Sequence, residues 1–304
     1  MDGTLLNDEG RVSARNLAAL QAAHAAGIEV VVATGRRHSY AMHVLRALEL
    51  PHTCTLVSSN GTVTRTFGSG TVAAQLIARN HMPHKTALWL CGHIDEFRNA
   101  LVFTFDRVGS DGDDVRGALV VEHLDELNAS IGRWMAANEP YIAHVIPIES
   151  ALDAGLTDAP IQAMLCGTIE RMRRAEARLL EHPGVMAVGH TTPVVEPHHQ
   201  IALHRTEYPG RDLSILDILP AGCSKGAALL SFAASRELEA AQILAIGDNW
   251  NDVPMLEIAG SAVVMANAPD DLKVLARARG WRIGRSNNED GVAEAIESAL
   301  AVPA

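Results

Sequence analysis

Two carboxylates, Asp248 and Asp252, are the residues of this sequence best suited to chemistry. They stand four positions apart after an apolar run at residues 242–246, where a strand is expected to turn into a helix. Carboxylate oxygens are hard ligands of the kind that Mg²⁺ prefers. The same two acids could instead cap the helix and occupy its first turn. The pattern leaves a magnesium site and a helix start as alternatives.

Three further polar clusters offer complementary chemistry. Each has an ordinary structural explanation when taken alone: an Asp-Gly turn, a helix N-cap threonine and a solvated lysine. A P-loop does not explain the lysine, because the pattern Gly-x-x-x-x-Gly-Lys is absent. Together, the clusters supply a carboxylate, a hydroxyl and amides for phosphate oxygens, and an ammonium group that neutralises charge. They are Asp2-Gly3-Thr4, Thr34-Gly35-Arg36 and Lys225.

A doubly wound parallel sheet is the fold that would bring these clusters together. Short apolar runs alternate with amphipathic segments at both ends of the sequence, which is typical of an α/β domain. Ligands of such sheets bind at the carboxyl ends of the strands, where the clusters fall. Strands are expected at residues 28–33, 54–58, 213–219, 242–246 and 261–265, with helices at 13–26, 38–48, 224–235, 269–278 and 291–300.

The middle of the sequence has a different pattern. Strand-like pieces alternate there with two long helical patterns at residues 122–138 and 168–180, which indicates an inserted α+β unit. We therefore predict a Rossmann-like core domain at 1–83 and 209–304, interrupted by an inserted α/β cap domain at 84–208.

The motifs resemble those of the haloacid dehalogenase (HAD) superfamily of phosphatases. Within it the chain resembles the Cof-type group, subfamily IIB, and the resemblance covers nearly its whole length. The most specific motifs are Asp248 to Asp252 with its continuation Val253-Pro254-Met255-Leu256, and the pairing of Met1-Asp2-Gly3-Thr4-Leu5-Leu6 with Val32-Ala33-Thr34-Gly35-Arg36. Ser59-Asn60-Gly61 and Asn288-Glu289-Asp290-Gly291-Val292 also fit.

The resemblance implies Mg²⁺-dependent hydrolysis of small phosphomonoesters, such as sugar phosphates or cofactor phosphates. Asp2 would protonate the leaving alcohol and then activate water. Thr34 would hydrogen-bond the transferring phosphoryl group, and Lys225 would stabilise its charge. The cap would close over the site and select the substrate.

The resemblance also implies the residues that hold the metal and the phosphate. Asp248 would bind Mg²⁺ directly, together with the backbone carbonyl of Asp2 and with Asp252, which supports the metal directly or through water. The remaining residues expected to bind substrate are Gly3, Gly35, Arg36, Asn60, Gly61 and Asn251.

The family's first motif contains a nucleophilic aspartate that forms an aspartyl-phosphate. Asp2 resembles the second aspartate of this motif, so the nucleophile would fall one residue before Met1, and the first strand of the core would fall before it. A buried strand with about four apolar side chains contributes roughly 6–12 kcal/mol, and whole domains are stable by only about 5–15 kcal/mol. We therefore expect that the sequence is truncated and lacks this strand. A catalytically inactive HAD-fold protein that binds a phosphorylated ligand or a partner is the alternative.

The composition argues against nucleic acids and membranes as partners. The net charge is -11, which argues against nucleic acid, because phosphate backbones favour basic surfaces. No run approaches the 18 or more apolar residues of a membrane span, and the four cysteines form no CxxC pair. We expect a cytoplasmic enzyme that acts on a small phosphorylated metabolite, away from membranes. The oligomeric state is not predicted.

Overall fold

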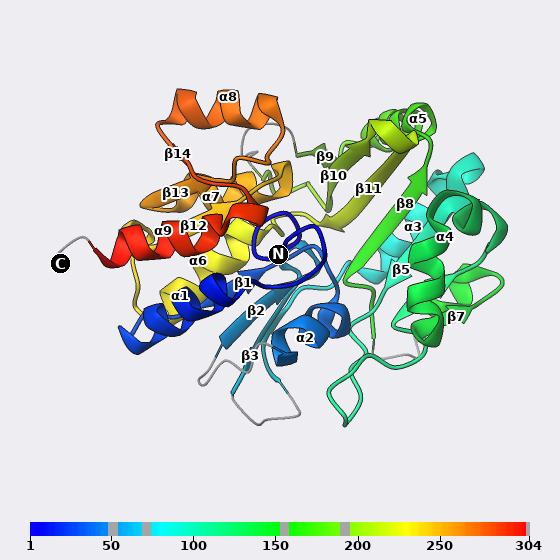
Figure 1. Ribbon diagram of the computed structural model, residues 1–304. Coiled ribbons are helices and arrows are strands. Elements are labelled where there is room, and N and C mark those ends of the chain that lie inside the picture. Colours follow the sequence, from blue (N-terminus) through cyan, green and yellow to red (C-terminus); the bar gives the residue numbers. More distant parts are fainter. Residues whose placement is uncertain (48–53, 69–73, 153–157, 189–194, 302–304) are drawn as a thin grey trace. The chain divides into compact units, whose positions relative to one another are not determined.

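The computed structural model describes residues 1–47, 54–68, 74–152, 158–188 and 195–301, which form two compact units (Figure 1). Unit 1 comprises Met1–Ile77 and Ser224–Ala304, and unit 2 comprises Ala78–Cys223. The chain passes from one unit to the other at 77/78 and 223/224, whereas the predicted domain boundaries were 83/84 and 208/209. The role of unit 2 as a cap remains a prediction.

The strands of unit 1 form two sheets. In the first, ordered β1-β2-β3-β4, β1 and β2 are parallel and β2 and β3 form an antiparallel hairpin. In the second, ordered β12-β13-β14, all neighbours are parallel. The strands are β1 (Val31–Ala33), β2 (Cys54–Ser58), β3 (Val63–Phe67), β4 (Gln75–Arg79), β12 (Leu244–Gly247), β13 (Ser261–Val264) and β14 (Arg282–Ile283).

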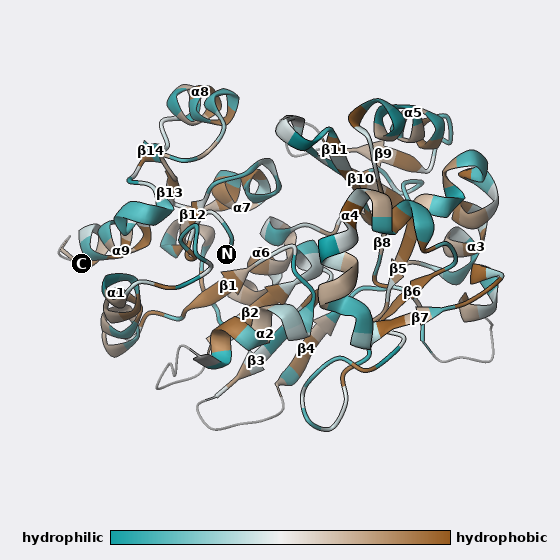
Figure 2. Cartoon of the chain, turned by 45° about the vertical axis from the view of Figure 1, so that its right-hand side comes forward, coloured by the Kyte–Doolittle hydropathy of each residue, from teal (hydrophilic) through white to brown (hydrophobic). Residues whose placement is uncertain are grey.

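Helices cover the strands of unit 1 on both faces. Val32 belongs to an apolar cluster with α1, α2 and α9, whereas its neighbours Val31 and Ala33 pack against the cluster of α6, α7 and α8. Figure 2 shows β1 and β2 as largely brown, as expected for strands covered on both faces. The helices are α1 (Ala14–Ala25), α2 (His38–Ala47), α6 (Lys225–Ser235), α7 (Val253–Ile258), α8 (Asp270–Arg279) and α9 (Gly291–Leu300). The α/β fold class is confirmed; the predicted end of α2 at Leu48 lies outside the described residues.

Unit 2 is built on a seven-stranded sheet with the order β7-β6-β5-β8-β11-β10-β9. Its pairs are antiparallel except β6 with β7 and β9 with β10. The strands are β5 (Leu101–Thr104), β6 (Leu119–Val121), β7 (Ile142–His144), β8 (Gln162–Gly167), β9 (Val185–Ala187), β10 (Ile201–Tyr208) and β11 (Leu213–Pro220).

Strand β11 corrects one prediction. The apolar run at residues 213–219 was expected to be a strand of the core sheet, but β11 pairs with β8 and β10 in unit 2. A short apolar run indicates that a strand forms, but it does not identify the strand's neighbours.

Helices also lie on both faces of the sheet of unit 2. Phe103, Leu165 and Leu216 form one apolar cluster with residues of α3 (His84–His93) and α5 (Ile169–Leu180). Val102 and Cys166 form the other, with residues of α4 (Asp125–Asn138). Side chains of adjacent strand residues point to opposite faces, so each strand contributes to both clusters.

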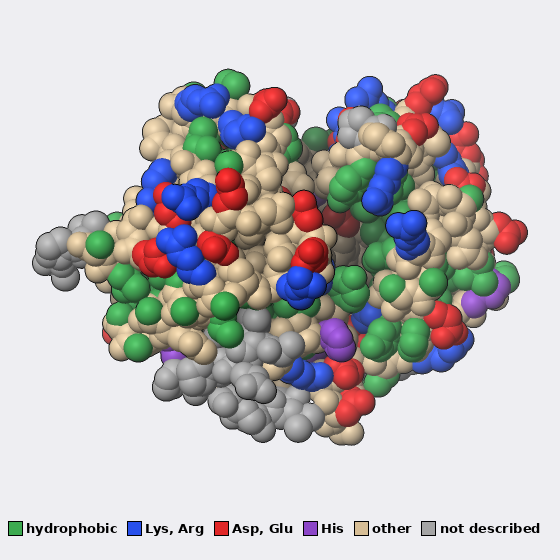
Figure 3. Space-filling view, viewed as in Figure 1, with side chains coloured by type: hydrophobic (Ala, Val, Ile, Leu, Met, Phe, Trp, Pro, Cys, Tyr) green, Lys and Arg blue, Asp and Glu red, His purple; other side chains and the backbone are tan. Residues whose placement is uncertain are grey.

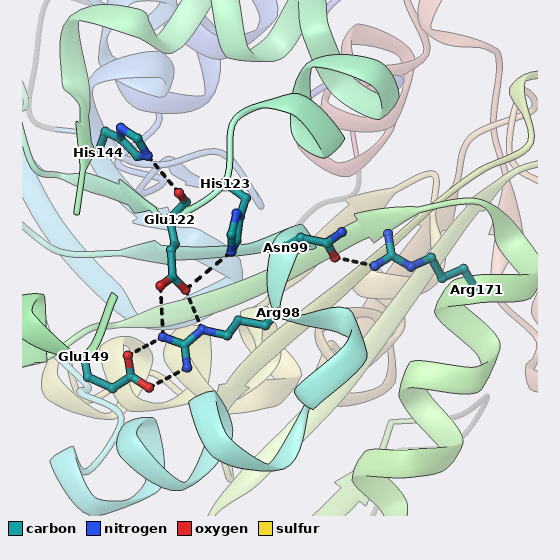
Figure 4. A network of polar contacts seen from close by, with 7 residues as sticks. All are labelled: Arg98, Asn99, Glu122, His123, His144, Glu149 and Arg171. Carbon is teal, nitrogen blue, oxygen red and sulfur yellow. Dashed lines mark hydrogen bonds and ion pairs between the residues drawn. The ribbon is translucent and has the colours of Figure 1, made fainter. Parts of the chain in front are cut away.

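Arg98, Glu122 and Glu149 form a network of ion pairs in unit 2 (Figure 4). Arg98 lies between two carboxylates: its Nη1 donates to Glu149 at 2.6 Å and its Nη2 to Glu122 at 3.1 Å. The hydrogen bonds from Arg98 lower the pKa of Glu149. The two carboxylates raise the pKa of Arg98, and the hydrogen bond with Glu149 has the largest effect. The side chain of Glu122 is 7% exposed, so its charge depends on Arg98 for compensation.

Replacing Arg98 with methionine is expected to lower the free energy of unfolding by about 1–3 kcal/mol, because Glu122 would remain buried with its main cationic partner removed. Chemical denaturation at pH 7 measures this. Part of the loss should depend on pH. Because the folded pKa of Glu149 is depressed, its stabilisation is present above its unfolded pKa of about 4.5 and is lost as the pH falls through the folded value.

Arg116→Met is the matched control, since the Arg116–Glu139 pair is long, at 3.8 Å, and both side chains are well exposed. We expect it to change the stability by less than about 0.5 kcal/mol. Equal effects of the two substitutions would contradict a structural role for the Arg98 network.

The surface does not carry a single dominant sign of charge on the face drawn in Figure 3, where blue and red side chains are interspersed on both units. Within the described residues, no helix has the length and apolar character needed to cross a membrane.

Candidate active site

Lys225 and Asp252 form a buried ion pair in unit 1. Lys225 begins α6, where the hydroxyl of Ser224 accepts a hydrogen bond from the backbone N–H of Ala227 and so caps the helix. Nζ of Lys225 lies 2.6 Å from Oδ1 of Asp252, and both side chains are 5% exposed. Lys225 is therefore not a solvated lysine, and its predicted role toward a phosphoryl group stays a prediction.

The loop after β12 is organised around the other oxygen of Asp252. Oδ2 accepts hydrogen bonds from the backbone N–H groups of Asp248, at 2.9 Å, and Asn249, at 3.1 Å. Gly247 makes this closure possible, because a Cβ atom there would lie 2.5 Å from the Cβ of Asp252. Asp252 thus fixes the loop that presents Asp248.

The N-terminal turn lies directly against Asp248. The hydroxyl of Thr4 donates to Oδ1 of Asp248 at 2.5 Å. Gly3 has φ of +65°, and a Cβ atom there would lie only 2.2 Å from Oδ2 of Asp248, so the position requires glycine. Thr4 belongs to the predicted cluster Asp2-Gly3-Thr4 but was not predicted to be a site residue, although its place two residues after Asp2 was the available signal.

Asp2 pairs with Arg36. The guanidinium makes two hydrogen bonds with the Asp2 carboxylate, one from Nε at 2.6 Å and one from Nη2, and it also lies over the ring of Tyr40. The side chain of Asp2 is 61% exposed and that of Arg36 is 19% exposed. Arg36, which was predicted to bind substrate, therefore binds Asp2, the predicted acid–base group.

The remaining predicted residues join the loops after β1 and β2. The backbone N–H of Asn60 donates to the carbonyl of Thr34 at 3.0 Å, and Oδ1 of Asn60 accepts from Nδ2 of Asn251 at 3.1 Å. A Cβ atom at Gly35 would lie 2.9 Å from the same Oδ1. At Gly61, where φ is +101°, a Cβ atom would lie 2.1 Å from the carbonyl oxygen of Ser224. These close approaches bring the loops after β1 and β2, the start of α6 and the loop after β12 into one site.

Both aspartates are buried, but their charged neighbours shift the two pKa values in opposite directions. Burial, and then the charge of Asp252, raise the pKa of Asp248 to about 6. Burial also acts to raise the pKa of Asp252, but Lys225 and then the α-amino group of Met1 outweigh it, and the net pKa is lowered. Ionisation of the Asp248 carboxyl therefore costs free energy, and a bound cation would offset that cost.

The side chains of the site could bind Mg²⁺, but they do not supply all of its ligands. No group of three or more His, Cys, Asp or Glu side chains suited to a metal occurs among the described residues. Asp2 faces Arg36 and Asp252 faces Lys225, which leaves Asp248 as the carboxylate best placed for direct binding. Mg²⁺ usually retains several waters and binds one or two carboxylates. The excess negative charge that raises the pKa of Asp248 is what such a cation would offset.

Comparison with known proteins places the chain in a family. Residues 1–151 and 198–296 match the haloacid dehalogenase-like hydrolase family. The 5-amino-6-(5-phospho-D-ribitylamino)uracil phosphatase YwtE of Bacillus subtilis is 29% identical over 318 residues, which cover 99% of this chain and 96% of that protein. The pyridoxal phosphate phosphatase YbhA of Escherichia coli is 28% identical over 303 residues, which cover 99% and 96%.

Solved structures agree on the fold. A haloacid dehalogenase-like hydrolase from Bacillus subtilis has a TM-score of 0.72 at 22% identity, covering 97% of this chain and 96% of its own. One from Bacteroides thetaiotaomicron has a TM-score of 0.70 at 23% identity, covering 98% and 96%. The α/β fold with a core sheet and a cap sheet is therefore established.

The comparisons do not support the expectation that the first core strand is missing. Both relatives are matched over 96% of their own length. The nucleophilic aspartate expected before Met1 is not a residue of this sequence, and it stays a prediction.

Proposed function

Because the chain belongs to the haloacid dehalogenase-like hydrolase family, as a Cof-type phosphatase of subfamily IIB, we propose that it hydrolyses small phosphomonoesters of polar metabolites with Mg²⁺ as cofactor. The family and the enzyme class, phosphoric monoester hydrolase, are those that the sequence predicted. The observation that carries the proposal is the buried arrangement of Lys225, Asp252 and Asp248, with Thr4 on Asp248.

Each side chain has a distinct part in this proposal. Lys225, held by Asp252, supplies a fixed positive charge for the transferring phosphoryl group. Thr34 is 2% exposed at the end of β1 and offers its hydroxyl to a phosphate oxygen. The pair with Arg36 fixes the orientation of the Asp2 carboxylate, which exchanges a proton with the leaving alcohol and then with water.

Asp248 would hold the magnesium ion, with the Asp2 backbone carbonyl, Asp252 and Asn251 nearby. The ion, when bound, offsets the negative charge of the phosphate and of the buried carboxylates. Gly3, Gly35, Asn60 and Gly61 shape the loops around it, because each permits a close backbone approach or holds a positive φ. Arg36 stays paired with Asp2, and we expect its positive charge to lie beside the bound phosphate.

The covalent step follows the family's chemistry. The nucleophilic carboxylate, expected immediately before Met1, forms a bond to phosphorus while the ester P–O bond breaks, and the leaving alcohol takes the proton of Asp2. Water then attacks the aspartyl-phosphate, giving its proton to Asp2 and releasing inorganic phosphate and the free carboxylate. Atoms and charge balance over the two steps without any further reactant.

Small, polar phosphate esters are the proposed substrate class. The two relatives are named for phosphatases of a ribitylamino-uracil phosphate and of pyridoxal phosphate. Unit 2, as a cap, would select among such leaving groups, as the inserted domain was predicted to do.

The test is hydrolysis of an aryl phosphate, pyridoxal phosphate and several sugar phosphates by two proteins: the 304-residue chain, and the same chain extended before Met1 by a segment that ends in an aspartate. We expect the extended protein to release phosphate with Mg²⁺, to lose at least about 100-fold in rate with EDTA, and to regain it when Mg²⁺ is restored. Activity in neither protein would overturn the proposal and favour an inactive, ligand-binding HAD fold. Equal activity in both would overturn the upstream nucleophile alone.

A further inference from the structure

Two asparagines outside the predicted site hold the turn that carries Asp2. Nδ2 of Asn267, just after β13, donates to the carbonyl oxygen of Gly3 at 2.8 Å. Nδ2 of Asn287, after β14, donates to the carbonyl oxygen of Leu6 at 2.9 Å. The N-terminal turn, dark blue in Figure 1, is thus bound by two side chains that stand 264 and 281 positions later in the sequence than the residues they contact.

The two asparagines are also joined to each other. The backbone N–H of Asn287 donates to Oδ1 of Asn267 at 3.0 Å. This bond orients the Asn267 amide, because Oδ1 must accept from Asn287 and Nδ2 is then directed at Gly3. Asn287 is 4% exposed, and its Nδ2 also lies 3.2 Å from Oδ1 of Asp8. We call Asn267 and Asn287 the asparagine pair.

Asn267 binds the carbonyl oxygen of Gly3, and Gly3 packs directly against Asp248. Gly3 lies against the carboxylate of Asp248, where a Cβ atom would be only 2.2 Å from Oδ2. The next residue, Thr4, makes the 2.5 Å hydrogen bond to Oδ1 of the same carboxylate. A rotation of the Gly3–Thr4 peptide would therefore change both the contact with Asp248 and the direction of Asp2, one residue earlier.

We propose that the asparagine pair consists of positioning residues for the phosphatase reaction, which set the place of the Asp2–Thr4 turn over Asp248. The inference rests on the proposed function. Neither asparagine touches the reacting atoms: Asn267 acts through the Gly3 carbonyl and Asn287 acts through Asn267 and Leu6. Partners of this kind around a catalytic site typically change activity by about 10- to 100-fold.

Asn267→Asp is the sharpest test. The new carboxylate can still accept from the Asn287 backbone, but it cannot donate to the Gly3 carbonyl and repels it. With Mg²⁺ and an aryl phosphate, kcat of the active form of the protein should fall about 10- to 100-fold while KM changes less than about threefold. Asn267 is exposed, so the variant should fold, and Asn267→Ala should give the same kcat effect without the added charge.

A second measurement does not need activity. Amide hydrogen exchange in metal-free protein should accelerate locally in residues 3–6 of Asn267→Asp and stay unchanged in unit 2. Asn128→Asp is the control, because it places the same charge on an exposed position of α4 and should alter neither readout.

Unchanged kcat, or exchange that accelerates throughout unit 1 in proportion to a global loss of stability, would overturn the inference. If the wild-type protein hydrolyses no phosphate ester, the proposed function fails separately. The exchange data still decide whether Asn267 holds the turn, so the two failures can be told apart.

Discussion

Replacing Lys225 with methionine is expected to remove phosphatase activity and to lower the free energy of unfolding by about 3–5 kcal/mol. Methionine has nearly the same length but carries no charge, so Asp252 would keep its burial and lose the ammonium 2.6 Å away. Breaking one partner of a buried ion pair leaves an uncompensated charge, which costs far more than the intact pair contributes. Urea denaturation and an aryl phosphate assay measure the two effects.

The double variant Lys225→Met/Asp252→Asn separates stability from chemistry. Asparagine removes the orphaned charge and retains an oxygen for the backbone N–H groups of Asp248 and Asn249. We expect the double variant to recover much of the lost stability and none of the activity. Recovered activity would show that Lys225 has only a structural role.

The pH dependence of Asp252 follows from the same pair. Its pKa is lowered in the folded protein, so the ion pair stabilises the fold above the unfolded pKa of about 3.8, and this stabilisation is lost as the pH falls through the folded value. The Lys225→Met variant should lose that part of the acid sensitivity.

Three components of the site could be found in the sequence because they stand close behind apolar runs. Thr34 and Asp248 follow β1 and β12 directly, and Asn60 stands two positions after β2. β1 and β2 are parallel neighbours, so their carboxyl ends lie at one edge of their sheet, whereas β12 belongs to the second sheet of unit 1. Lys225 was placed correctly at the start of a helix capped by Ser224. A local sequence pattern was enough to place these residues, because a residue that follows a strand in the sequence also lies at the end of that strand in space.

The pairing of side chains was not predictable in the same way. Asp2 and Arg36 were assigned separate roles, but the two loops that carry them meet, and a carboxylate and a guanidinium within reach form a bidentate pair. Asn267 and Asn287 were passed over because isolated asparagines in turns are ordinary, and only the tertiary structure shows that both reach the N-terminal turn. Strand β11 was assigned to the wrong sheet for the same reason: its partners β8 and β10 cannot be read from an apolar run.

Asp248→Asn is expected to lower kcat/KM by at least about 100-fold and at the same time to stabilise the metal-free protein. The loss follows from the proposed metal site, because an amide is a much weaker magnesium ligand than a carboxylate. The gain follows from burial and from the charge of Asp252, which raise the pKa of Asp248 to about 6 and so penalise its ionised form. Asparagine keeps an oxygen for the hydroxyl of Thr4 while removing that charge.

The sign of the stability effect depends on pH in a defined way. A carboxyl with a raised folded pKa binds more protons in the folded state, so its contribution to stability is full below the unfolded value of about 3.8 and declines as the pH rises through about 6. In EDTA, Asp248→Asn should therefore exceed the wild type in Tm at pH 7 and lose that advantage near pH 4. Asp270→Asn is the control, because that carboxylate is 97% exposed on α8 and should change neither Tm nor rate appreciably. A variant that loses both stability and activity would mean that Asp248 serves the fold, whereas opposite changes indicate a residue kept for function at a cost to stability.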